Sequence, residues 1–163
     1  MTLFQQNLAS LCTAISLASS PALVGAADEY NASTGLTAAG KPLGLHGVDP
    51  VAFNIIGNRA LGRAEFTEVH DGVAYYFSSK ANAKLFKKNP EAFIPQYGGF
   101  CTYGTSVGKK FDGDPKFSAV IDNKLYVFLN EDIFNAFQKD VAGTIQKAEK
   151  NWSKIKHTAV SEL

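Results

Sequence analysis

The chain has 163 residues, of which 45% are hydrophobic and 19% are charged, and its formal net charge at pH 7 is +1. This length supports one ordinary domain with a hydrophobic core and is too short for two large ones. The near-neutral charge, with lysines and acids interspersed, argues against a nucleic-acid-binding protein or one held on an anionic membrane by charge.

The first 26 residues have the pattern of an export signal. No charged side chain occurs before Asp28, and the apolar run ends in small residues, with Val24 and Ala26 at positions that suit a cleavage site. Pro21 interrupts the run too early for a membrane span. We therefore predict a signal peptide over residues 1–26, a periplasmic or secreted mature chain, and no stable membrane insertion after signal removal.

The segment after the signal is expected to be an irregular arm over residues 27–45, because it is polar and rich in glycine. In the next segment, DPVAFNIIG, strand-forming residues lie between Pro50 and Gly57 and predict a short strand. AEFTEVH and VAYYFSS then predict two strands joined by a tight turn at Asp71 and Gly72, followed by a helix over KANAKLFKK.

The second half repeats this order. FSAVID and KLYVFLN predict two strands, and Asn130 is suited to cap a helix over EDIFNAFQKD. A last amphipathic helix is expected from about Val141 to Ile155, where apolar residues recur at spacings of three or four.

A shift of 51 residues places the first half on the second without a gap, as for Phe66 and Phe117. We therefore predict an α+β fold built from two pseudo-repeated β-hairpin-plus-helix units, about 62–94 and 113–145. The units are expected to pack as a single domain over residues 46–157, with the amphipathic helix at its C-terminal end.

A glycine-rich stretch, YGGFCTYG, lies at the join of the two units and contains Cys101. Cys12 leaves with the predicted signal, so Cys101 is the single cysteine of the mature chain and no internal disulfide is expected. The flanking glycines allow close approach of the backbone or a positive φ, which suits a thiolate that faces a metal or an oxidant. A buried packing role fits the same residues, because free cysteines are often buried.

No local metal-binding motif is present. The three histidines, His46, His70 and His157, form no HxH or HExxH pattern, so any metal site must be assembled from distant parts of the chain. The mature chain has no methionine, which excludes a methionine-rich copper site and leaves one thiolate, imidazoles and oxygen donors.

The order GVDPVAF, then GVAYYFSSKANAKLFKKNPEAFIPQYGGFC, resembles the YHS-domain family, small modules often found in or beside copper-handling proteins and some oxygenases. The resemblance covers about Val48 to Phe93, and the extension through YGGFCTYG, KLYVFLN and NWSKI is similar to the exported, stand-alone branch. In some members of that branch the position matching Cys101 is read as selenocysteine. This implies a reactive or metal-facing role for Cys101.

The chain also departs from the family. Many YHS modules carry cysteines after the DPV motif and at the junction of strand and helix, and these are thought to bind metal. Here those positions hold Ala52, Ser78 and Asn82. The resemblance therefore implies that any remaining chemistry is centred on Cys101.

The first hypothesis is an exported, non-catalytic binding protein for copper or another soft metal ion. Cys101 would be the thiolate ligand, His46 or His70 the imidazole ligand, and Asp49 a carboxylate that orients the site.

Two alternatives stay open. In the first, the chain is a thiol-redox protein in which Lys109 or Lys110 stabilises the Cys101 thiolate and a protein partner supplies the second thiol. In the second, it is a protein-interaction module in which Cys101 is purely structural.

Overall fold

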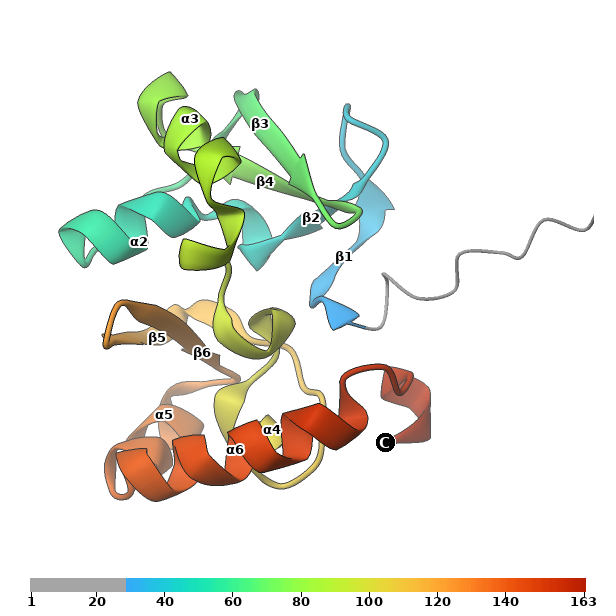
Figure 1. Ribbon diagram of the computed structural model, residues 1–163, viewed down its shortest axis with the longest axis vertical. Coiled ribbons are helices and arrows are strands. Elements are labelled where there is room, and N and C mark those ends of the chain that lie inside the picture. Colours follow the sequence, from blue (N-terminus) through green and yellow to red (C-terminus); the bar gives the residue numbers. More distant parts are fainter. Residues whose placement is uncertain (1–28) are drawn as a thin grey trace, which may run out of the picture.

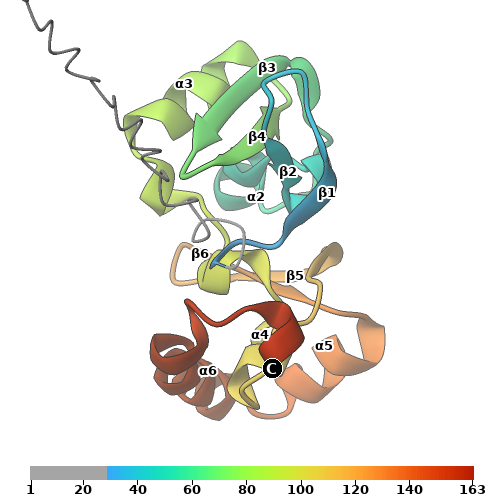
Figure 2. The same cartoon turned by 90° about the vertical axis from the view of Figure 1, so that its right-hand side faces the viewer.

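The two halves of the chain lie one above the other in space (Figure 1). The computed structural model describes residues 29–163, so the predicted signal peptide lies outside the described residues. The first half contains a four-stranded sheet and the second a two-stranded sheet. Helices pack beside both sheets, and the two views agree that the chain crosses from one half to the other near residues 90–100 (Figures 1 and 2).

The elements of the first half are β1 (Ala32–Leu36), β2 (Pro42–Gly44), α2 (Pro50–Ile56), β3 (Arg63–His70), β4 (Val73–Phe77) and α3 (Lys80–Lys88). Those of the second half are α4 (Thr102–Ser106), β5 (Asp114–Ile121), β6 (Lys124–Phe128), α5 (Glu131–Gln138) and α6 (Val141–Ile155). Short 3-10 turns cover Leu45–Gly47, Pro90–Ala92, Gln96–Gly99 and Val160–Glu162. The predicted α+β class is confirmed.

The stretch predicted to be an irregular arm contains two of the strands. β1 pairs antiparallel with β2, and β2 pairs parallel with β4, which gives the strand order β1-β2-β4-β3. The Oγ of Ser33 accepts a hydrogen bond from the N–H of Leu43 at 3.0 Å and ties the two strands together. Four of the five residues of β1 are exposed, so its sequence lacks the alternation of apolar residues that marks a strand.

The segment predicted to be a short strand, DPVAFNIIG, is helix α2 instead. The Oδ1 atom of Asp49 accepts hydrogen bonds from the N–H groups of Val51 and Ala52 at 2.9 and 3.0 Å, and Pro50 occupies the first turn, where its missing N–H costs nothing. Gly57 ends the helix in the left-handed conformation, at a φ of 62°. These end signals outweigh the strand preference of the branched residues, which depends strongly on context.

The two hairpins have the same register. His70 pairs with Val73 at the turn of β3–β4, and Ile121 pairs with Lys124 at the turn of β5–β6. Ile121 lies 51 positions after His70, and Lys124 lies 51 positions after Val73, as the sequence shift predicts. This agreement supports the repeat, while a common origin of the two units stays a prediction.

Each half has its own aromatic core. In the first half, Phe86 of α3 packs on Tyr75 and Phe77 of β4, with ring centroids 5.1 and 5.0 Å apart. In the second half, Phe137 of α5 packs on Phe128 of β6, with centroids 4.4 Å apart. The same packing of a helix on a strand therefore stabilises each of the two units internally.

A third apolar cluster joins the halves. Leu45, Val48 and Phe53 of the first half pack against Leu125 and Val127 of β6. All five are buried. The two units thus share a buried apolar contact, as expected for parts of a single domain.

The C-terminal helix α6 begins and ends at the residues predicted for it. It packs against α4, and its buried residues are Thr144, Ala148 and Ile155. Within residues 29–163, no helix combines the length and the apolar character that crossing a membrane requires.

Candidate metal centre and the surroundings of Cys101

Cys101 is sealed in the aromatic core of the second half. It is 1% exposed and belongs to the cluster that contains Tyr97, Tyr126 and Phe128. Its Sγ accepts a hydrogen bond from the N–H of Gly104 at 3.4 Å, which makes Cys101 the N-cap of α4. Burial raises the pKa of the thiol, and the backbone N–H groups around the sulfur offset this only in part. A buried thiol of raised pKa is a poor nucleophile and a poor metal ligand.

Cys101 occupies the position in the second half that Asp49 occupies in the first. Both are N-caps of the short helix that follows them. Both side chains also accept a hydrogen bond from the backbone N–H that follows the second strand of the hairpin, that of Ser78 for Asp49 and that of Leu129 for Cys101. Cys101 lies 52 positions after Asp49, whereas Leu129 lies 51 positions after Ser78. An alignment of the two halves with a constant shift of 51 therefore does not pair Asp49 with Cys101.

Asp49 is a structural carboxylate. It is fully buried, and its Oδ1 caps α2. Its Oδ2 accepts hydrogen bonds from the N–H and Oγ–H of Ser78 at 2.8 and 2.7 Å and from Nδ2 of Asn82 at 2.7 Å. With both oxygens engaged, Asp49 does not orient a metal ligand. Ala52, Ser78 and Asn82 thus all donate hydrogen bonds to this one carboxylate.

The structure places the two lysines predicted to stabilise a thiolate in different surroundings. Lys109 is exposed. Lys110 is buried, and its Nζ donates hydrogen bonds to the carbonyl oxygens of Lys156 and Thr158 at 2.9 and 2.7 Å. An ammonium at the C-terminal end of α6 is favourable because unpaired carbonyl groups and the negative end of the helix dipole meet there. The structure therefore gives no support to a thiol-redox role for Cys101.

His46 pairs with Asp112 where the two halves meet. Its Nε2 lies 2.9 Å from the Oδ1 of Asp112, which also accepts a hydrogen bond from Nδ2 of Asn31 at 2.6 Å. Burial acts to raise the pKa of Asp112, but the hydrogen bonds from Asn31 and His46 outweigh it and lower the pKa. The negative charge of Asp112 in turn acts to raise the pKa of Cys101, opposite to the effect that a neighbouring lysine would have.

His70 is the histidine that meets two carboxylates. Its Nε2 lies 3.1 Å from Oε1 of Glu91 and 3.4 Å from Oδ2 of Asp71. His70 ends β3, Asp71 lies in the hairpin turn, and Glu91 belongs to the 3-10 turn after α3. Across residues 29–163, these three form the one group of three or more histidine, cysteine or acidic side chains close enough to share a metal ion.

The predicted ligand set is thus not assembled as expected. Cys101 is sealed in a core, Asp49 caps its own helix, and His46 is paired with Asp112. His70 alone meets further potential ligands, and neither of its partners was among the predicted residues. The sequence predicts the hairpin turn, and the turn places Asp71 next to His70. The contact between Glu91 and His70 cannot be predicted from a local pattern, because it forms only when α3 packs on the hairpin.

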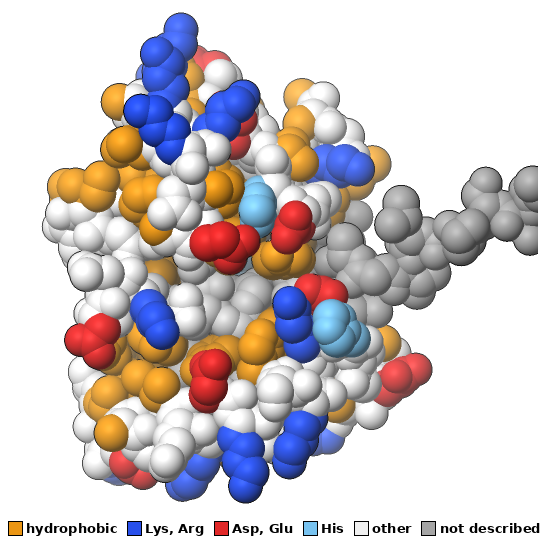
Figure 3. Space-filling model, viewed as in Figure 1, with side chains coloured by type: hydrophobic (Ala, Val, Ile, Leu, Met, Phe, Trp, Pro, Cys, Tyr) orange, Lys and Arg blue, Asp and Glu red, His pale blue; other side chains and the backbone are white. Residues whose placement is uncertain are grey.

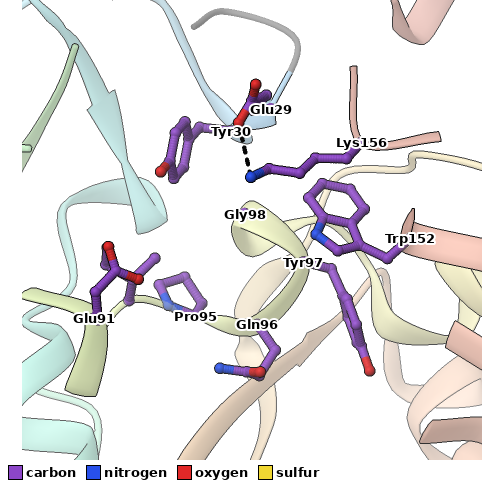
Figure 4. A pocket seen from close by; sticks show the side chains of 10 residues that line it. Glu29, Tyr30, Glu91, Pro95, Gln96, Tyr97, Gly98, Trp152 and Lys156 are labelled. Atoms are coloured by element: carbon purple, nitrogen blue, oxygen red, sulfur yellow. Dashed lines mark ion pairs between the residues drawn. The ribbon is translucent and has the colours of Figure 1, made fainter. Parts of the chain in front are cut away.

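A pocket of about 160 Å³ lies next to this group, where the two halves meet (Figure 4). Tyr30 and Glu91 are on one side of it and Trp152 and Lys156 on the other. Lys156 is paired with Glu29, with 3.2 Å between Nζ and Oε2. The space-filling view shows a hollow between the halves with acidic, basic and histidine side chains along its edges (Figure 3). The group is therefore reachable from solvent.

No protein-family model, curated protein or solved structure matches this chain. A function must therefore be argued from the residues of the site and their chemistry.

Proposed function

We propose that this chain is a small, non-catalytic binding protein for a divalent metal ion, held by His70, Asp71 and Glu91. The observation that carries the proposal is one imidazole nitrogen that lies within 3.4 Å of two carboxylate oxygens, with all three donor atoms within 4.8 Å of one another. These donors suit divalent copper or zinc, whereas monovalent copper prefers thiolates. Sites with nitrogen and oxygen donors bind copper(II) more tightly than the other divalent first-row metals, so we propose copper(II) as the ion.

The surroundings of the group favour a preformed site. The ring of His70 meets Phe86 edge to face, with centroids 6.2 Å apart and planes at 89°, which limits its rotation. The hydroxyl of Tyr30 donates a hydrogen bond to Oδ2 of Asp71 at 2.9 Å, as groups behind a metal ligand commonly do. The side chains of Asp71 and Glu91 are 60% and 77% exposed, so an ion can enter and keep coordination positions for water.

The proposal moves the expected copper site from Cys101 to His70 and keeps the expected function. Membership of the YHS family and export to the periplasm or the medium stay predictions.

The test is calorimetric titration of the chain with copper(II) chloride, in the presence of glycine to suppress weak surface binding. We expect one ion per chain for the wild type and loss of that binding in His70→Ala and Glu91→Gln. Pulsed electron paramagnetic resonance of the copper-loaded wild type should detect one imidazole nitrogen. Circular dichroism shows whether each variant remains folded.

His46→Ala is the matched control, because His46 is also paired with a carboxylate but, among residues 29–163, belongs to no group of three potential ligands. It should keep the copper affinity of the wild type, as should Cys101→Ser. Unchanged binding in His70→Ala would refute the proposal. Loss of binding in Cys101→Ser would return the site to the thiol.

A further inference from the structure

A second pocket, of about 360 Å³, lies beside the His46–Asp112 pair. Its wall consists of residues 31–34 at the start of β1, together with Leu43, His46 and Asp112. None of these residues takes part in the His70 group. A ligand bound here would therefore be independent of the proposed metal ion.

The charge of this pocket is one-sided. Asp112 carries a carboxylate, and among the described residues that line the pocket none is a lysine or an arginine. The hydrogen bonds from Asn31 and His46 engage Oδ1 and favour the ionised form of Asp112. The side chain is 55% exposed, so a solute can still reach it. Such a pocket attracts cations and repels anions.

His46 adds a second polar group from a strained backbone position. Its φ of 50° and ψ of 27° lie in the left-handed region, and the residue 52 positions later, which corresponds to it in the second half, is Gly98 at a φ of 63°. Glycine adopts this conformation without strain, whereas histidine does not. Nε2 faces Asp112, so when the imidazole is neutral and carries its proton on Nε2, Nδ1 can accept a hydrogen bond from a ligand.

We propose that this pocket binds a small organic ammonium compound. The ammonium group would donate hydrogen bonds to Asp112 and His46, and its hydrocarbon part would lie against Leu43 and Ala32. A bare ion does not fill the space, because the pocket is more than ten times the roughly 30 Å³ that one water molecule occupies in the liquid. Charge and shape together select a cation with an apolar part.

The test is a titration of the chain with n-butylammonium chloride, followed by two-dimensional amide NMR. We expect saturable shifts that centre on residues 31–34, Leu43 and Asp112. Sodium pentanoate has the same n-butyl chain and the opposite charge, and potassium chloride supplies a positive charge without a hydrocarbon part. Equal shifts with either control would overturn the proposal, as would shifts that do not centre on this pocket.

Two variants test separately how the carboxylate of Asp112 and the shape of the pocket contribute to binding. Asp112→Asn should raise the Kd for butylammonium about tenfold or more, the value of a charged hydrogen bond, while Asp122→Asn, in the β5–β6 turn, should not change it. Thr34→Phe fills the pocket from an exposed strand position and should abolish binding with the His46–Asp112 pair intact. Unchanged affinity in folded Asp112→Asn or in Thr34→Phe would refute the assignment.

Discussion

Replacing Asp49 by alanine tests whether one buried carboxylate organises the first half. The side chain accepts five hydrogen bonds, two on Oδ1 from the start of α2 and three on Oδ2 from Ser78 and Asn82. Alanine removes the acceptor of all five donors at a site that is 0% exposed. Three of these donors are backbone N–H groups, which cannot rotate toward another partner.

The expected cost follows from these bonds. Loss of an N-cap costs about 1 kcal/mol, and each further buried donor left without a partner costs about 1–3 kcal/mol. The side chains of Ser78 and Asn82 are partly exposed and can turn to water, whereas the backbone N–H of Ser78 cannot. We therefore expect Asp49→Ala to lower the free energy of unfolding by about 2–4 kcal/mol, a large share of the roughly 5–15 kcal/mol that holds a typical domain. Asp49→Asn should cost less, because asparagine keeps one side-chain oxygen. In either orientation of the amide, that oxygen accepts the hydrogen bonds of one of the two sets of donors.

Urea unfolding, followed by the fluorescence of the single tryptophan Trp152 and by circular dichroism, measures the loss. Cys101→Ala is the matched control, because it removes the cap at the corresponding position of the second half. Its sulfur is a weak acceptor, bonded to the N–H of Gly104 at 3.4 Å and to that of Leu129, so we expect a loss of only about 1 kcal/mol. Equal losses in the two variants, or a loss below about 1 kcal/mol for Asp49→Ala, would refute the reasoning.

Two further predictions follow from the pKa directions. The pKa of Asp112 is lowered on folding, so its contribution to stability is complete above the unfolded value near 3.8 and is lost as the pH falls through the folded pKa. The difference in unfolding free energy between the wild type and Asp112→Asn should therefore shrink as the pH is lowered from about 7 to about 2.5. A difference that does not depend on pH would contradict a lowered pKa for Asp112. Cys101, with its raised pKa and 1% exposure, should react with a disulfide reagent about 100-fold more slowly in the folded chain than in urea. Equal rates in the folded chain and in urea would show that the Cys101 thiol is accessible to the reagent in the folded chain.

The hairpins and the helices that follow them are predictable because several local signals agree. Alternating apolar residues, a turn pair such as Asp71 and Gly72, and a capping residue such as Asn130 all indicate the same elements. For α2 the signals conflict. Its branched residues favour a strand, while Asp49, Pro50 and Gly57 favour a helix, and the caps prevail.

The candidate site is less predictable, because packing rather than local pattern assembles it. Glu91 reaches His70 only after α3 has folded onto the hairpin. The burial of Cys101 depends in the same way on the packing of α6 against α4. A glycine-rich loop of the same sequence could present its thiol to solvent, so neither outcome can be derived from residues 97–104 alone.

Strand β6 has consequences for how the chain unfolds. Its alternate residues point to opposite sides, Leu125 and Val127 toward the first half and Tyr126 and Phe128 toward the helices of the second. A hairpin of two strands is marginal alone, and this one has its second apolar layer supplied by the other half. We therefore expect amide protons in both halves to exchange through one cooperative opening. Fragments cut near residue 95 would then behave as complementary pieces that reassociate, rather than as two small domains.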